Sequence, residues 1–146
     1  MSGLLNIRQG GRIRYNLPTN TTTAYKRGQA IVVNAFGQLE ILAAQGSAFV
    51  GIAGETCLAT GSNNALADTN TVIAGQQGSI YCGEAIVETD NLSGTGGWEV
   101  GVTNVWAQAG GNFGQLGAGV LCGKALSDPA SNGRLTFFFR ANLSGL

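Results

Sequence analysis

The side chains that most often perform catalysis are sparse in this sequence. It contains no histidine, which excludes Ser-His-Asp and Cys-His catalysis and most transition-metal sites. The three cysteines are Cys57, Cys82 and Cys122, and none of them belongs to a Cys-x-x-Cys pair. We therefore expect no metal ion and no cofactor.

A phosphate-binding loop is also missing. The nearest match to a Walker loop ends in Gly123-Lys124-Ala125 and has Ala118 where the first glycine should stand. The eight Asp and Glu residues are scattered, so spacing alone leaves a paired-carboxylate glycosidase open. Glu84 and Glu88 are predicted to be solvent-facing charges on or beside one strand. Together these features predict no catalytic residue, no enzymatic activity and no small-molecule substrate.

The rest of the sequence has the pattern of short strands separated by turns. A chain of 146 residues has the size of one domain, and turn residues recur about every eight to twelve positions, as in β sandwiches and barrels. We predict a mostly β, compact single-domain fold, a β barrel or β-tulip-like structure with at most one or two short helices. The only helix candidate lies within 59–68. The predicted strands are 29–34, 38–42, 49–53, 71–74, 79–88, 100–106, 118–126 and 134–141.

Two stretches of the chain resemble each other. The first copy reads Tyr25-x-x-Gly28, an apolar strand, Phe36-Gly-Gln-Leu39 and Val50-Gly-Ile-Ala53; the second reads Trp98-x-x-Gly101, an apolar strand, Phe113-Gly-Gln-Leu116 and Leu121-Cys-Gly-Lys-Ala125. The pattern predicts a hairpin followed by a strand that crosses back, used twice, with a turn at the glycine after each Phe and a bulge or close backbone approach at the glycine of each crossing strand. Chance similarity among glycine-rich hairpins is the alternative.

The composition indicates self-association. Charged residues are 11% of the chain, against about 25% in ordinary domains, and the net charge is zero. Little therefore opposes association between copies. The N-terminus lacks the pattern of a signal peptide, and no apolar run approaches the ~20 residues of a membrane span. We expect a chain made in the cytoplasm and not secreted, with no membrane partner and with free thiols.

The basic residues gather at the N-terminus. Five of the eight lie in the first 27 residues, where no Asp or Glu occurs. We predict a flexible basic arm and linker over 1–24 and the β domain over 25–146. Residues 12–17 alternate apolar and polar, so the arm has the pattern of a strand. Three interpretations of this arm stay open: a docking segment that orders on a partner, a frayed terminus, or the first strand of the domain. The modest charge and the acidic body argue against nucleic acid as a partner.

Several stretches of the sequence resemble the lambda-type head decoration proteins of tailed bacteriophages, also called capsid-stabilising or cement proteins. These are Tyr25-Lys-Arg-Gly-Gln-Ala-Ile-Val-Val, Phe49-Val-Gly-Ile-Ala-Gly, Gly78-Ser-Ile-Tyr-Cys-Gly-Glu-Ala, and the closing Val120-Leu-Cys-Gly-Lys-Ala-Leu with Arg134-Leu-Thr-Phe-Phe-Phe-Arg. The resemblance spans about 25–141. It implies a homotrimer on the outer surface of the virion, with an arm that orders on the shell.

On this resemblance the partner is the major capsid (coat) protein, and the arm pairs with coat strands by β-augmentation. The candidate capsid-binding residues are Arg8, Arg12, Ile13, Arg14, Tyr15 and Leu17. Two alternatives stay open: another virion or tail component, and a carbohydrate-binding module that uses Trp98 or Trp106.

Overall fold

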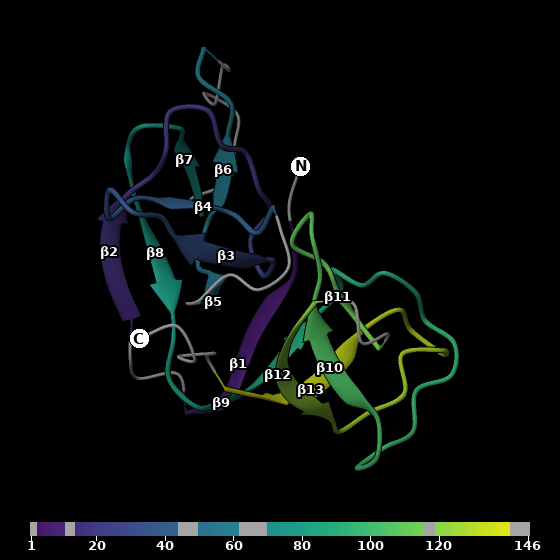
Figure 1. Ribbon diagram of the computed structural model, residues 1–146. Coiled ribbons are helices and arrows are strands. Elements are labelled where there is room, and N and C mark those ends of the chain that lie inside the picture. The colour runs from purple at the N-terminus through teal and green to yellow at the C-terminus, as the bar shows by residue number, and fades with distance from the viewer. Residues whose placement is uncertain (1–2, 11–13, 44–49, 62–69, 116–118, 141–146) are drawn as a thin grey trace.

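The computed structural model describes residues 3–10, 14–43, 50–61, 70–115 and 119–140, and within them the chain forms strands and no helix (Figure 1). The all-β, single-domain prediction is confirmed, and the described pairing leaves both large sheets open. The strands are β1 (Leu5–Gly10), β2 (Arg14–Pro18), β3 (Ala30–Val33), β4 (Leu39–Ile41), β5 (Val50–Ala53), β6 (Thr56–Leu58), β7 (Thr71–Ile73), β8 (Gln77–Tyr81), β9 (Ala85–Thr89), β10 (Asn104–Ala107), β11 (Phe113–Gly114), β12 (Val120–Ala125) and β13 (Leu135–Phe139).

The strands form three layers. A six-stranded antiparallel sheet has the order β1-β9-β13-β12-β10-β11, and a five-stranded one the order β2-β8-β5-β3-β4. The main core lies between them, where Val32 and Ile52 of the second sheet join Val87 and Phe137 of the first. The parallel pair β6-β7 covers the other face of the five-stranded sheet over a smaller core that includes Ile31. Burial on both faces explains why β3 and β5 are apolar throughout.

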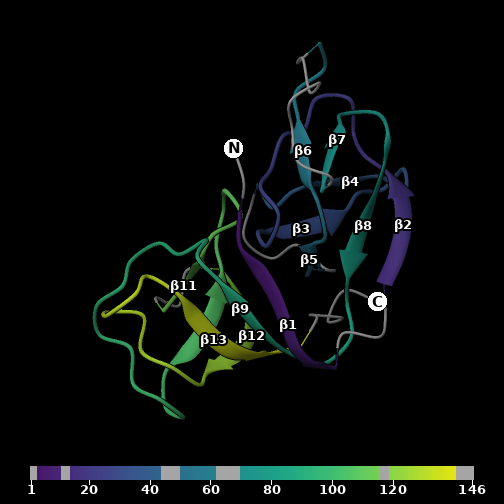
Figure 2. The same cartoon turned by 180° about the vertical axis from the view of Figure 1, so that it is seen from behind.

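The N-terminal residues are two strands of the body, and not a separate arm. β1 pairs with β9 in the six-stranded sheet, and β2 pairs with β8 in the five-stranded sheet. The ribbon β1-β2 therefore follows the ribbon β8-β9 from one sheet into the other (Figures 1 and 2). The predicted linker is packed at two positions, Thr19 and Thr23, which are buried, while Thr21 and Thr22 between them are exposed. Among the described residues, the predicted boundary between an arm and a domain at residue 24 is therefore wrong. The alternating pattern of 12–17 correctly indicated a strand, but this strand, β2, pairs with β8 of the same chain.

The repeat prediction is confirmed in topology. β3 and β4 form a hairpin and β5 returns to the other side of β3; β10 and β11 form a hairpin and β12 returns to the other side of β10. The glycines of the crossing strands lie against neighbouring backbone. A Cβ on Gly51 would lie 2.6 Å from the Tyr81 carbonyl oxygen, and one on Gly123 would lie 2.2 Å from that of Phe138. Close backbone approach therefore requires both glycines.

The two Phe-Gly-Gln-Leu segments differ in structure. Gly37 has a φ of 73° in the turn between β3 and β4, as predicted. Gly114 lies in β11 and has no positive φ, so the second predicted turn is wrong. Phe36 is 87% exposed at its turn, whereas Phe113 is fully buried. The two copies of the repeat therefore share their strand order, but the Phe and Gly residues of the shared motif have different structural positions.

Most predicted strands are present with shifted ends. The stretch 79–88 is two strands in different sheets, because the chain crosses between sheets at residues 82–84. Residues 100–103 form a turn before β10. The short strands β6 and β11 were not predicted, because two or three residues are too few to show an alternating apolar and polar pattern. Of the helix candidate, residues 59–61 are not helical and 62–68 lie outside the described residues.

No disulfide joins Cys57, Cys82 and Cys122, as predicted. Cys57 and Cys122 are buried and Cys82 is half-buried after β8. Burial raises the pKa of Cys122 to about 12. The Cys122 thiol therefore stays protonated and unreactive at neutral pH.

Replacing Cys122 by Ser is expected to lower the free energy of unfolding by about 1–3 kcal/mol, because a hydroxyl takes the place of a buried thiol. Cys122→Ala should cost less, and Cys82→Ser should also cost less because Cys82 is partly exposed. Urea unfolding of the three variants checks this order. In the native protein, iodoacetamide should leave Cys122 unmodified; rapid alkylation of this residue would contradict its position in the core.

Candidate functional site

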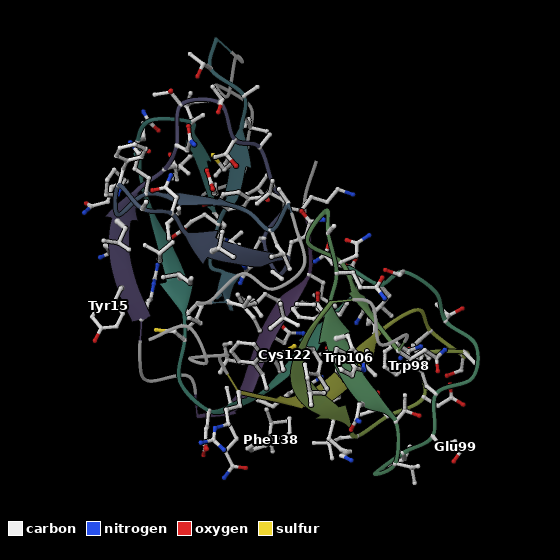
Figure 3. The ribbon with its side chains drawn as sticks, viewed as in Figure 1. Tyr15, Trp98, Glu99, Trp106, Cys122 and Phe138 are labelled. Atoms are coloured by element: carbon white, nitrogen blue, oxygen red, sulfur yellow. The ribbon has the colours of Figure 1, made fainter. Side chains whose placement is uncertain are left out.

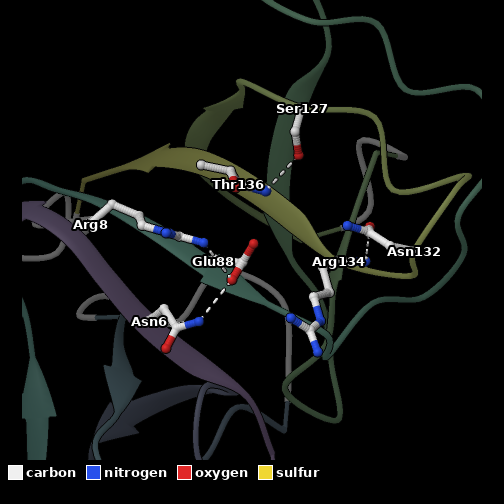
Figure 4. Close-up of polar contacts among 7 residues, drawn as sticks. All are labelled: Asn6, Arg8, Glu88, Ser127, Asn132, Arg134 and Thr136. Carbon is white, nitrogen blue, oxygen red and sulfur yellow. Dashed lines mark hydrogen bonds and ion pairs between the residues drawn. The ribbon is translucent and has the colours of Figure 1, made fainter.

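Arg8, the first of the predicted capsid-binding residues, has a partner within the chain. It lies in β1, and its guanidinium contacts the Glu88 carboxylate of β9 at 3.0 Å. Asn6 donates a second hydrogen bond to the same carboxylate at 2.8 Å (Figure 4). Only 10% of the Glu88 side chain is exposed, so the prediction of a solvent-facing Glu88 is wrong, while Glu84 is exposed as predicted. This contact fixes β1 to the edge of the six-stranded sheet.

Glu88 makes stability depend on pH in the acid range. Hydrogen bonding from Asn6, supported by Arg8 and opposed by burial, lowers the pKa of Glu88 below its ordinary value of 4.5. A carboxyl whose folded pKa is lowered stabilises the fold above its unfolded pKa, and that contribution disappears as the pH falls through the folded pKa.

We therefore expect the difference in melting temperature between the native chain and Glu88→Gln to be largest near neutral pH and to shrink below about pH 4.5. Thermal unfolding from pH 7 to pH 3 measures it. Glu84→Gln is the matched control, since its side chain is 63% exposed and its ion pair with Arg140 is long, at 3.7 Å. Parallel curves for Glu88→Gln and the native chain would contradict the expectation.

Arg14 is held in a second network. It contacts the Glu55 carboxylate at 2.9 Å, and its guanidinium lies 5.4 Å from the centre of the Tyr81 ring. Glu55 also accepts hydrogen bonds from the backbone and hydroxyl of Ser79. The arginine is thus positioned by β8 and by the turn between β5 and β6. Its guanidinium stabilises β2 on the sheet, in addition to any role toward a partner.

The apolar residues of β2 have different surroundings. Leu17 packs against the smaller core, whereas Tyr15 is 59% exposed at the edge (Figure 3). Arg12 and Ile13 lie outside the described residues. Of the six predicted residues, the structure thus places Arg8 and Arg14 in contacts within the chain and Leu17 against the core. Tyr15 remains a candidate contact, because β2 is an edge strand of the five-stranded sheet among the described strands.

The outer face of the six-stranded sheet carries exposed apolar side chains that are not among the predicted binding residues. Leu121 of β12 is 47% exposed beside Trp106 of β10, and Phe138 of β13 is 39% exposed beside Ile86 of β9 (Figure 3). Outer faces of antiparallel sheets are normally polar. A signal existed: if Leu135, Phe137 and Phe139 face the core, Phe138 must face outward. We call these four side chains, Ile86, Trp106, Leu121 and Phe138, the outer apolar face.

The two tryptophans of the carbohydrate-binding alternative differ in burial. Trp106 belongs to the outer apolar face, and Trp98 is 4% exposed with its indole N–H donated to the Gly94 carbonyl at 3.0 Å. Trp98 lines a pocket of about 180 Å³ together with Ser93, Gly94, Gln108, Gly114 and Gln115. Of the two candidates for carbohydrate binding, Trp98 is therefore mostly buried and borders the pocket, whereas Trp106 is half-buried.

The described part of the chain holds no group of three or more His, Cys, Asp or Glu side chains arranged to bind a metal ion. No helix among those residues is long and apolar enough to span a membrane. Comparison of the sequence with family models, with curated proteins and with solved structures gives no match.

Proposed function

We propose that this chain is a non-enzymatic structural protein that binds the outer surface of a bacteriophage capsid and stabilises the expanded shell as a homotrimer. The observation that carries the proposal is the outer apolar face. A chain with 11% charged residues and no net charge gains solubility when such a face is covered. The specific partner, the coat protein, comes from the resemblance in the Gly-rich strands.

The contact that we propose with coat protein differs from the one expected from the sequence, in which a loose arm pairs with coat strands. Because β2 is already paired with β8, it is not a loose arm that inserts into the shell. Its other side is a free sheet edge among the described strands. A coat strand could add to that edge by main-chain hydrogen bonds, with Tyr15 beside it. β-Augmentation thus remains the proposed mode, with this protein supplying a preformed edge.

Co-sedimentation of the full chain with expanded capsid shells tests the capsid-binding role. We expect saturable binding at a ratio that fits trimers, and shells that resist heat better when bound. Absence of binding to expanded shells would overturn the proposed function. Light scattering coupled to size exclusion measures the free state, where Phe138→Glu should shift trimers toward monomers.

Phe36→Glu is the matched control for that substitution. Phe36 is the more exposed of the two, at 87%, but it lies at the tip of the β3-β4 turn, away from the outer apolar face. Equal effects of Phe36→Glu and Phe138→Glu on association would show that general exposure of Phe, and not this face, drives assembly.

A further inference from the structure

The pocket beside Trp98 has features of a small ligand site. Its volume of about 180 Å³ is below the ~300 Å³ at which sites for drug-sized ligands begin. At ~30 Å³ per water molecule it would hold about six waters. The space suits a single small ring bearing several polar groups.

Two carboxamide side chains border the pocket, and glycines make room for both. A Cβ on Gly114 would lie 2.4 Å from the Gln108 amide nitrogen, and one on Gly97 would lie 3.1 Å from that of Gln115. Gly97 has a φ of 80°, which side chains rarely adopt. Larger residues at these two positions would displace the amides, so the glycines keep both carboxamides at the pocket.

Hydrogen bonds orient these groups and leave part of their capacity unused. The Ser93 hydroxyl donates to the Gln108 Oε1 atom at 2.6 Å, and the Gln115 amide nitrogen donates to the Gly96 carbonyl. Within the described part of the chain, neither the Gln108 amide nitrogen nor the Gln115 Oε1 atom takes part in a hydrogen bond. A carboxamide offers two donors and a carbonyl with two lone pairs. The pocket therefore presents both a donor and an acceptor, held in place.

None of the six lining residues is charged. An ionic ligand would lose hydration without gaining a counter-charge there, which disfavours phosphates, carboxylates and amines. An apolar ligand would leave the two amides unpaired. A neutral ring with vicinal hydroxyls can satisfy both amides while its C–H groups contact the part of the indole that lines the pocket. We propose that this pocket binds one neutral sugar residue, so that the protein attaches to a surface glycan.

Nuclear magnetic resonance of the full chain tests the site, because the protein has only two tryptophans. The indole N–H of Trp98 donates to Gly94, which lines the pocket, whereas Trp106 does not line it, so the Trp106 signal serves for comparison. Titration with glucose, galactose, mannose and N-acetylglucosamine should shift the Trp98 signal in a saturable way for at least one sugar, and shift it more than the Trp106 signal. No saturable shift of Trp98 with any of the four would overturn the proposal.

Two pairs of variants locate the binding. Gln108→Ala should weaken it by about tenfold or more, as expected for a lost hydrogen bond, whereas Gln9→Ala on the exposed part of β1 should not. Gly94→Leu should block the pocket without strain, because a Cβ there meets no atom within 4 Å. Gly96→Leu is equally unhindered but does not line the pocket. Unchanged affinity in both Gln108→Ala and Gly94→Leu would refute the site, whatever the outcome of capsid binding.

Discussion

Deletion of residues 2–20 is expected to abolish the cooperative unfolding of this protein. The deletion removes β1 and β2, so that β9 and β8 each lose one of their two neighbouring strands. It also uncovers the core at Leu5, which is 3% exposed, and leaves the carboxylates of Glu88 and Glu55 without Arg8 and Arg14. The combined loss is comparable with the whole stability of a domain, about 5–15 kcal/mol.

Circular dichroism and calorimetry of the truncated chain measure this effect. The double variant Arg8→Gln with Arg14→Gln is the control, since it removes the two charges and keeps both strands. It should stay folded with a lower melting temperature, because the carboxylates of Glu88 and Glu55 keep their hydrogen bonds from Asn6 and Ser79 when the arginines are replaced. A truncated chain that melts at the native temperature would show that residues 2–20 form an appended arm, as the charge pattern by itself suggested.

The parts of the fold that could be predicted are those set by local alternation of apolar and polar residues along a strand. Alternation placed Leu135, Phe137 and Phe139 on the buried face of β13, and all three are at most 1% exposed. The glycines of the two crossing strands were also identified correctly. Long-range pairing could not be predicted, because any strand with a free edge fits the alternating pattern of 12–17. The choice of β8 as its neighbour depends on contacts more than 60 residues away in sequence, between Arg14 and Tyr81 for example.

The candidate site was harder to predict than the fold. Clustered arginines indicated a surface for an acidic partner, but Arg8 and Arg14 each contact a carboxylate supplied by a distant part of the chain. Net charge along the sequence does not show which charges are neutralised in the fold. The pocket was equally hidden, since Gln108 and Gln115 have no motif and meet only because β10 and β11 form a hairpin.

Phe137→Ala is expected to lower the free energy of unfolding by about 3–5 kcal/mol. The Phe137 ring is fully buried in the main core, 5.0 Å from the centre of the Phe113 ring and 6.3 Å from that of Phe139. Close packing on both sides means that the neighbouring rings cannot collapse fully into the space left by the deletion. Denaturant unfolding of the variant, with the slope of the transition unchanged, measures the loss.

Phe138→Ala is the matched control, because it removes the same ring from the next position of the same strand. Phe138 is 39% exposed on the outer apolar face, so its truncation should cost about 1 kcal/mol or less in unfolding of the monomeric protein. Its effect should instead fall on assembly, where loss of an aromatic anchor weakens association. Phe137→Ala, measured at a temperature where it remains folded, should retain association. If Phe138→Ala destabilised the fold as strongly as Phe137→Ala and left association intact, the outer apolar face would be structural, and the trimer would have to form through another surface.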